Sequence, residues 1–253
     1  MRIVAGTLRG RALVAPKGHS TRPTADRVRQ ALFDVLEHAA FSPGLAGVRV
    51  LDLFAGSGAL GLEALSRGAA SCLFIDSDPA AAQAISLNIR ALKLEGRTQI
   101  SLDDAARLKP FSRPSIPTVI PASGPPSRGP ESRDPADLAS GAGRGERQGL
   151  GTGGAKSPGS RIAALKRCVR DDGEGGDAIL EATPFDLTFL DPPYGLGLAE
   201  RALRSLRQGG WLAEGAVAVV ERGASEPAFD PAGFEPQDVR AWGPARVHFF
   251  RTF

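Results

Sequence analysis

The fold is decided by the stretch from Val50 to Gly61, which reads VLDLFAGSGALG. The run from Val48 to Phe54 is mostly apolar and predicts a buried strand, and the pattern from about Ala59 to Arg67 predicts a helix. Three glycines between and within these elements have the spacing G-x-G-x-x-G: Gly56, Gly58 and Gly61. Because glycine permits tight turns and close approach of the backbone to a ligand, the stretch predicts a strand, a ligand-binding turn and a helix.

The rest of the chain alternates between the same two kinds of element. Apolar runs predict further strands at Cys72–Ile75, Gln99–Leu102, Phe185–Leu190, Ala216–Val220 and Arg246–Phe253, the last of them antiparallel. Helical spacing predicts helices from Pro23 to about Ala39, from Asp78 and Pro79 to about Leu92, and from Leu198 to about Leu206. Strands separated by helices indicate an α/β protein with a mainly parallel sheet and helices on both faces.

The overall composition excludes several classes of protein. The chain has 253 residues, enough for a sizeable core, and its two cysteines form no C-x-x-C pair, so neither a disulfide scaffold nor a zinc ribbon is expected. The three histidines define no metal site by their spacing. Since no apolar run is long enough to cross a bilayer and Met1 is not followed by a secretory segment, we predict a cytoplasmic protein with no membrane contact.

Positive charge is concentrated at the beginning of the chain. The net charge of the whole chain is +3, but the first thirty residues contain seven Arg or Lys and one acid, Asp26. Turn glycines flanked by apolar residues predict a short hairpin from about Arg2 to Val14, and the following helix begins among arginines. A basic arm of this kind suits a polyanionic partner. A transit peptide is also rich in Arg, but Gly6 and Pro16 interrupt any long amphipathic helix here.

The middle of the chain differs in composition from both sides. Residues 110–160 contain 9 Pro and 10 Gly, and large apolar residues are scarce there. Such a segment cannot build a core, so we interpret residues from about 110 to 180 as a disordered insertion. The predicted organisation is a basic extension over residues 1–40, followed by one domain over 41–253 that contains the insertion.

Polar side chains follow four of the predicted strands. They lie at Asp52–Gly61, Asp76, Asp104 and Asp191–Tyr194. Ligands of parallel α/β sheets bind beyond the carboxyl ends of the strands, so these four segments are expected to meet at one edge. Any one of these acids is equally compatible with a solvated loop. The coincidence of four is the stronger observation.

The glycine-rich segment and Asp76 fit a cofactor that contains adenosine. Asp76 follows Gly56 by twenty residues, and an acid after the second strand can accept hydrogen bonds from both ribose hydroxyls. This pattern alone leaves a nicotinamide dinucleotide and S-adenosylmethionine both open. Asp52 favours the latter, because a carboxylate within the first strand could hold a ligand's ammonium group.

The sequence Asp191-Pro192-Pro193-Tyr194 suits an exocyclic amine of a nucleobase. The lone pair of such an amine is conjugated into the ring, so the nitrogen is a poor nucleophile. A carboxylate at Asp191 and a carbonyl at Pro192 can accept both N–H bonds and favour a more tetrahedral nitrogen, while Tyr194 stacks on the base. The alternative is a strand exit that is merely stiffened by prolines.

With these two motifs, the sequence resembles the S-adenosylmethionine-dependent amino-methyltransferases. Several segments narrow the resemblance to the family that methylates N2 of guanine 966 in bacterial 16S ribosomal RNA: residues 2–6, 9–11, 21–24, 26–29, 32–33 and 51–68. The resemblance implies a Rossmann-like class I methyltransferase fold with a seven-stranded sheet. It also implies S-adenosylmethionine as cofactor and a monomer that acts on the assembling small ribosomal subunit.

The resemblance assigns roles to individual residues. The catalytic set is Asp191, Pro192, Pro193 and Tyr194. The cofactor-binding set is Thr24, Asp52, Phe54, Ala55, Gly56, Ser57, Gly58, Asp76, Ser77, Asp104 and Ala105. The residues expected to contact RNA are Arg9, Arg11, Arg22, Arg27 and Arg29, and no metal is expected.

Three other functions remain open at this point. An amino-methyltransferase acting on adenine N6 or cytosine N4, in DNA or in another RNA, uses the same two motifs, but no separate target-recognition domain is evident. A nicotinamide-dependent oxidoreductase explains the glycines and Asp76 and leaves Asp191–Tyr194 without a role. A non-catalytic RNA-binding protein needs only the basic arm.

Overall fold

The computed structural model describes residues 1–16, 23–111 and 183–253. Most of the predicted insertion lies outside these residues, as does Arg22. The side chain of Thr24 also lies outside the description, although its backbone belongs to the first helix.

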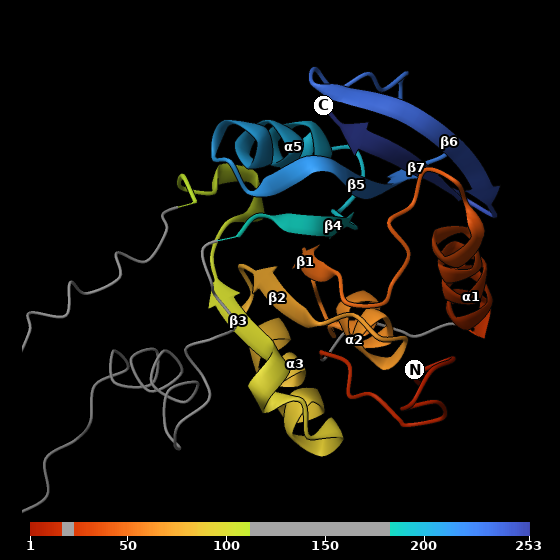
Figure 1. Cartoon of the computed structure of the whole chain (residues 1–253), viewed down its shortest axis with the longest axis vertical. Helices are drawn as coiled ribbons and strands as arrows, with labels where there is room; N and C mark the ends of the chain where they lie inside the picture. Colours follow the sequence, from red (N-terminus) through yellow and green to blue (C-terminus); the bar gives the residue numbers. More distant parts are fainter. Residues whose placement is uncertain (17–22, 112–182) are drawn as a thin grey trace, which may run out of the picture. The chain divides into compact units, whose positions relative to one another are not determined.

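The described strands form one seven-stranded sheet in the order β3-β2-β1-β4-β5-β7-β6 (Figure 1). Their bounds are β1 Arg49–Leu53, β2 Ser71–Asp76, β3 Thr98–Leu102, β4 Phe185–Leu190, β5 Leu212–Gly223, β6 Phe234–Trp242 and β7 Ala245–Thr252. The strands β1 to β5 pair in parallel, and β7 is antiparallel to both of its neighbours. The mainly parallel sheet and the antiparallel last strand are confirmed.

Four α-helices and two short 3-10 helices accompany the sheet in the described residues. They are α1 Pro23–His38, α2 Ala59–Ser66, α3 Pro79–Leu92, α5 Leu198–Gln208, η1 Glu95–Arg97 and η2 Ala105–Arg107. The start of α3 follows the sequence rule closely, because the Asp78 carboxylate accepts the Ala80 N–H at 2.8 Å and Pro79 occupies the first turn. None of the helices in these ranges is long and apolar enough to span a membrane.

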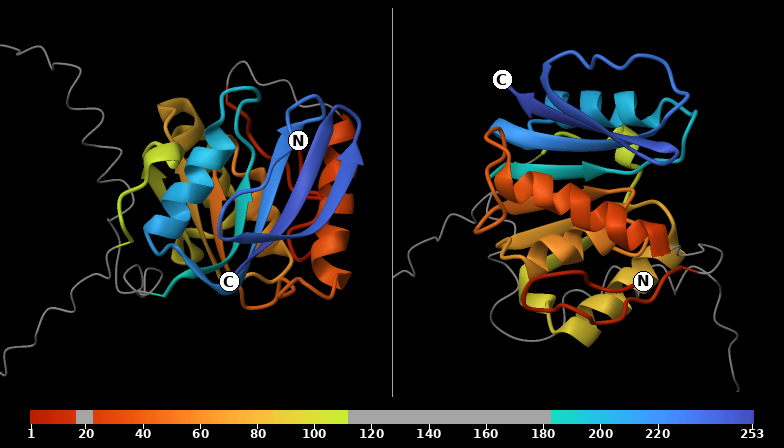
Figure 2. Two further views of the ribbon diagram at one scale, coloured as in Figure 1. Left: turned by 90° about the horizontal axis from the view of Figure 1, so that it is seen from above. Right: turned by 90° about the vertical axis from the view of Figure 1, so that its right-hand side faces the viewer.

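Both faces of the sheet are covered, each by a separate apolar core. Side chains such as Val50 and Phe74 pack in one core with residues of α1, α2 and α3. Their neighbours along the same strands, such as Leu51 and Ile75, pack in the other core with α5. Strand side chains alternate between faces, so one buried strand serves both cores. Figure 2 shows α1 and α5 on opposite faces of the sheet.

The strand β6 was not located by the sequence pattern. It is an edge strand that pairs only with β7, and among its residues only Phe234 is buried. Pro236 and a register shift near it remove the regular alternation that marks a half-buried strand. The remaining polar residues therefore resemble a loop in the sequence.

The N-terminal hairpin is present as a single bridge between Arg2 and Ala12. It is fastened to α2 by Glu63, a fully buried carboxylate that accepts the N–H groups of Val4 at 2.7 Å and Ala5 at 2.8 Å. Glu63 also pairs with Arg67 at 2.9 Å. Buried charges are stable only when paired and hydrogen-bonded in this way. The division of the chain at residue 40 stays a prediction.

Candidate active site

The four polar segments lie at one edge of the sheet, where β1, β2, β3 and β4 end. The parallel register aligns Leu53 of β1 with Ile75 of β2 on one side and with Leu190 of β4 on the other. Asp76 is aligned in turn with Leu102 of β3. The carboxyl ends of these four strands are thus adjacent, which is the arrangement predicted from the sequence.

Glycine is required for a different structural reason at each of the three positions of the G-x-G-x-x-G segment. Gly56 has φ +56° and faces open space, where a Cβ would meet only a backbone oxygen at 4.0 Å. Gly58 also has positive φ, and a Cβ there would lie 3.2 Å from the ring of Phe74. A Cβ on Gly61 would come within 2.5 Å of the Cys72 sulfur. Gly56 therefore leaves room for a ligand, whereas Gly61 lets α2 pack closely on the sheet.

The turn itself is strained at its first residue. Phe54 has φ +57°, in a region that residues with a side chain rarely adopt. The following residues are held by two backbone hydrogen bonds, from Ala55 N–H to the Ile75 carbonyl at 3.3 Å and from Gly58 N–H to the Ala55 carbonyl at 2.7 Å. Such strain persists where the surrounding structure fixes the backbone, as it does at many ligand sites.

Asp76 is fixed in place by two backbone donors. One carboxylate oxygen accepts the Gly56 N–H at 2.8 Å and the other accepts the Asp78 N–H at 2.8 Å. Each oxygen keeps a further lone pair, and the side chain is partly exposed. A carboxylate held in this way can accept two more hydrogen bonds from a ligand. Ser77 beside it is exposed.

Asp104 and Ala105 begin the short helix η2 at the end of β3. The Asp104 carboxylate accepts the Ala106 N–H at 2.9 Å, while Ala105 is buried. The exposed Asp103 is joined to β2 through its N–H, which donates to the Asp76 carbonyl at 3.2 Å. These contacts place Asp104 near the end of the neighbouring strand.

Asp52 is buried within β1 and is 2% exposed. Its carboxylate accepts the Gly61 N–H at 2.9 Å and so joins β1 to α2. Burial raises the pKa of this carboxyl to about 8, the Gly61 hydrogen bond lowers it, and the nearby carboxylates of Asp191 and Asp76 raise it. Asp52 thus has a structural contact that the sequence pattern did not indicate. A contact with the cofactor stays a prediction.

Asn88 is a site residue that sequence reasoning missed. This side chain is 1% exposed, and its amide donates to the carbonyls of Ser57 and Val14, each at 2.9 Å. Its oxygen accepts the Val14 N–H at 2.8 Å. Asn88 therefore joins the N-terminal arm, the glycine turn and α3. A polar residue on the otherwise apolar face of a predicted helix was the available signal.

The Asp191–Tyr194 loop follows β4 directly. Asp191 is exposed in the free protein, but the protein groups around it still partly desolvate its carboxyl, and this desolvation, followed by the charge of Glu221, raises its pKa to about 7. Pro192 is buried, Pro193 is exposed, and Tyr194 is 46% exposed. Burial of the phenol and its hydrogen bond to Glu221 also raise the pKa of Tyr194.

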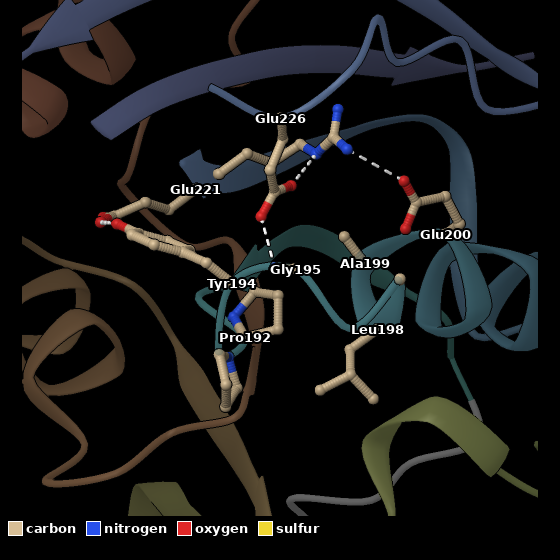
Figure 3. Close-up of a pocket in the computed structure, with 11 residues that line it drawn as sticks. Pro192, Tyr194, Gly195, Leu198, Ala199, Glu200, Glu221 and Glu226 are labelled. Atoms are coloured by element: carbon tan, nitrogen blue, oxygen red, sulfur yellow. Dashed lines mark hydrogen bonds and ion pairs between the residues drawn. The ribbon is translucent and has the colours of Figure 1, made fainter. Parts of the chain in front are cut away.

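A small hollow adjoins this loop (Figure 3). Its lining combines the loop with β5 and the start of α5, and includes Pro193, Tyr194, Leu198, Glu221 and Glu226. Glu221 and Glu226 of this lining were not found from the sequence. They lie about 30 positions after the loop, and no local spacing links them to it.

The arginines expected to contact RNA divide into two groups. Arg9, Arg11 and Arg27 are exposed, and Arg11 donates to the Ala91 carbonyl at 3.2 Å. Arg29 is only 5% exposed, and its guanidinium donates to the carboxylate of Asp26 at 2.6 Å and to the Arg2 carbonyl at 2.7 Å. The expectation for Arg29 is corrected, because its charge is used inside the protein to hold the arm.

The sheet order identifies the class of the fold. A dinucleotide-binding Rossmann fold has the order 3-2-1-4-5-6, whereas β7 here is inserted antiparallel between β5 and β6. A solved Escherichia coli structure described as "Putative methyltransferase yhhF" is similar, with a TM-score of 0.60 and 27% identity over all of this chain and 97% of that one. The protein has the Rossmann-like class I fold of S-adenosylmethionine-dependent methyltransferases, with its sheet covered on both faces.

The chain belongs to the family described as conserved hypothetical protein 95, whose model matches residues 1–117 and 162–251. Ribosomal RNA small subunit methyltransferase D of Escherichia coli K12 is 29% identical over 87% of this chain and 74% of its own. The Bacillus subtilis protein "Putative rRNA methyltransferase YlbH" is 45% identical over 107 residues, which are 42% of this chain and 55% of that protein.

Proposed function

We propose that this protein transfers a methyl group from S-adenosylmethionine to the exocyclic N2 amine of a guanine in 16S ribosomal RNA, at guanine 966. The observation that carries the proposal is the Asp191–Tyr194 loop at the strand end next to the glycine turn. The names of the relatives support RNA of the small subunit as substrate. The proposed enzyme acts in the cytoplasm as a monomer on the assembling subunit.

The residues present fit the cofactor. Gly56 faces space that a Cβ would enter, which suits close approach of a ligand to the backbone. Asp76 has lone pairs for the ribose hydroxyls, and Asp104 with Ala105 would lie beside the adenine. When bound, S-adenosylmethionine supplies the methyl group from a positively charged sulfur, and the carboxylates of Asp52 and Asp191 offer it a favourable field. Phe54, Ala55, Ser57, Gly58, Ser77 and Thr24 complete the proposed contacts.

The catalytic groups act mainly by alignment. The Asp191 carboxylate and the Pro192 carbonyl would accept hydrogen bonds from the two N–H groups of the guanine amine. Tyr194 would hold the base by stacking, and Pro193 would stiffen the backbone of the loop. Acceptors placed where positive charge develops on nitrogen stabilise the transition state. Among the described side chains, no group of three or more His, Cys, Asp or Glu is placed to hold a metal ion.

Asp191 is also a suitable acceptor for the proton that the amine must lose. A carboxyl with a pKa near 7 holds a proton at neutral pH far better than an ordinary Asp does. Asp191 thus accepts a hydrogen bond from the amine before transfer and can take the proton afterwards. Water competes for the second role.

The basic arm would bind the RNA backbone. Arg9, Arg11 and Arg27 are exposed and can neutralise phosphates, so binding should weaken as salt increases. The target guanine must leave its stack to enter the site, which suits a loop nucleotide or a flipped base.

The decisive experiment is transfer from labelled S-adenosylmethionine to unmodified small subunits, naked 16S RNA and duplex DNA, followed by nucleoside mass spectrometry. N2-methylguanosine at position 966 is the expected product. Methyladenine or methylcytosine would keep the enzyme class and overturn the substrate. If no substrate is methylated and the protein binds a nicotinamide dinucleotide or RNA alone, the proposal fails.

A further inference from the structure

Three side chains from β5 and the turn after it hold the Asp191–Tyr194 loop and the peptide that follows it through hydrogen bonds and ion pairs. We name Glu221, Arg222 and Glu226 the β5 clamp. They lie at the hollow of Figure 3, and the reaction described above uses none of them. Their contacts with the loop are specific enough to indicate a role.

The ring of Tyr194 is held at two points. Its hydroxyl donates to the Glu221 carboxylate at 2.6 Å, as the dashed line in Figure 3 marks. At its other end the ring lies over Gly223, where a Cβ would be only 3.4 Å from ring carbon Cδ2. A hydrogen bond to a charged acceptor is stronger than a neutral one. Together the two contacts fix both the position and the tilt of the ring.

The peptide after Tyr194 is held by the rest of the clamp. Gly195 N–H donates to one Glu226 oxygen at 2.7 Å, and the other oxygen lies 2.9 Å from Arg222 Nε. Arg222 is 6% exposed and also pairs with Glu200 of α5 at 3.1 Å. A buried cation with two acidic partners has little freedom. The clamp therefore joins the loop to β5 and α5.

Without these contacts, the ring of Tyr194 would have several accessible orientations. Tyr194 is 46% exposed, and both Gly195 and Gly197 adopt positive φ, so little packing limits the ring. An exposed side chain samples several rotamers, and fixing one of them on binding costs conformational entropy. A ring that is fixed beforehand offers the base a ready stacking surface.

We propose that Glu221 is a positioning residue that holds the ring of Tyr194 in the plane on which the target base stacks, while Glu226 and Arg222 fix the adjoining peptide. The stacking part of this inference rests on the proposed function. The contact between Glu221 and Tyr194 does not depend on it.

The first test observes Tyr194 directly, since it is the only tyrosine of the chain. A ¹³C label on the phenol carbon gives one NMR signal, whose alkaline titration is compared among wild type, Glu221→Gln and the exposed-site control Glu235→Gln, with circular dichroism to verify the fold. The phenol pKa of Glu221→Gln should fall toward its ordinary value of 10.0, and that of the control should not. An unchanged titration in Glu221→Gln would overturn the clamp.

The second test is a double-mutant cycle of Tyr194→Phe and Glu221→Ala with RNA as substrate. Each single variant should lower kcat/KM for RNA by about tenfold, the loss expected for one charge-assisted hydrogen bond, with S-adenosylmethionine affinity unchanged. The double variant should be no worse than either single one. Independent, multiplying losses would overturn the positioning role. If the wild-type protein methylates no guanine, the proposed function fails. The titration alone then shows whether Glu221 holds Tyr194.

Discussion

At the scale of single residues, the candidate site is a concentration of carboxyl groups. Desolvation is the largest cause of the raised pKa values of the buried Asp52 and the exposed Asp191, and neighbouring carboxylates raise both pKa values further. A cationic ligand relieves this repulsion and favours the ionised forms. The same acids that repel one another in the free protein therefore attract a positively charged cofactor.

Binding of S-adenosylmethionine should consequently tighten as pH rises from about 6 to 9, the range set by pKa values of about 7 and about 8. The free protein holds protons on these carboxyls at the low end of the range, and the bound cation lowers their pKa, so binding releases protons. Calorimetry in buffers of different ionisation enthalpy measures that release. S-adenosylhomocysteine, which lacks the sulfonium charge, is the matched ligand, and equal pH dependence for both would contradict the prediction.

Replacement of Asp191 by Asn should separate catalysis from cofactor binding. The variant keeps one acceptor and the shape of the side chain but cannot take a proton, so kcat should fall by about a hundredfold. S-adenosylmethionine should still bind, with the pH dependence of its affinity reduced. Asp230→Asn, at an exposed position, is the control. Turnover near that of wild type would exclude Asp191 as a catalytic residue.

At the scale of elements, we expect a Gly→Ala substitution in the glycine turn to have a different effect from one in α2. Gly56→Ala meets only the backbone penalty of a positive φ, about 1 kcal/mol, but places a methyl group in the proposed cofactor space. Its S-adenosylmethionine affinity should fall at least tenfold. Gly61→Ala presses on Cys72, so its free energy of unfolding should fall by about 2 kcal/mol, with affinity nearly preserved.

Denaturant unfolding and calorimetry on the same samples test this contrast. Gly96→Ala is the control, because a Cβ there meets nothing within 4 Å. Reversed outcomes, with Gly61→Ala losing affinity and Gly56→Ala losing stability, would show that the turn is not shaped for a ligand.

Asn88→Ala should weaken the connection among the arm, the glycine turn and α3. It removes three hydrogen bonds and leaves the buried Ser57 carbonyl and the partly buried backbone groups of Val14 without them, so the free energy of unfolding should fall by about 3 kcal/mol. Proteolysis of the arm should also become faster. Gln83→Ala, exposed on the same helix, should change neither measurement. A protected arm in a stable variant would contradict the role given to Asn88.

The elements that were predictable from sequence are those whose patterns are local. Buried parallel strands such as β1 and β4 are mostly apolar runs, and the Asp78–Pro79 start of α3 follows a local rule. The edge strand β6 lacks such a pattern, because a half-exposed edge places few demands on its side chains. Polar β5 residues near the loop, such as Glu221, depend on tertiary packing that spacing does not encode.

The candidate site was predictable to the same extent. Asp76 and Asp191 were located because each ends an apolar run, and parallel strands bring their ends together. Arg29 was misassigned because charge in a sequence does not reveal burial. Its partners, Asp26 and the Arg2 carbonyl, become neighbours only when the arm folds onto α1.

At the scale of the whole molecule, the family match divides the chain into two parts. The family model matches residues 1–117 and 162–251, so the segment 118–161 belongs to neither matched stretch. All four strand ends that form the candidate site lie within the matched stretches. The described part of the candidate site is therefore built from the two matched stretches.

Deletion of residues 118–161, with a short Gly-Ser linker in their place, should leave the cofactor site intact. Because the matched stretches supply every strand of the described sheet, the melting temperature and the affinity for S-adenosylmethionine should stay close to wild type. Methyl transfer to small subunits is then measured for both proteins over a range of salt, with Arg9→Gln as the reference for a lost phosphate contact. Unchanged transfer would show that the segment is dispensable for the reaction. Weaker RNA binding with unchanged cofactor affinity would make it an additional RNA contact, and loss of cofactor affinity would contradict the prediction.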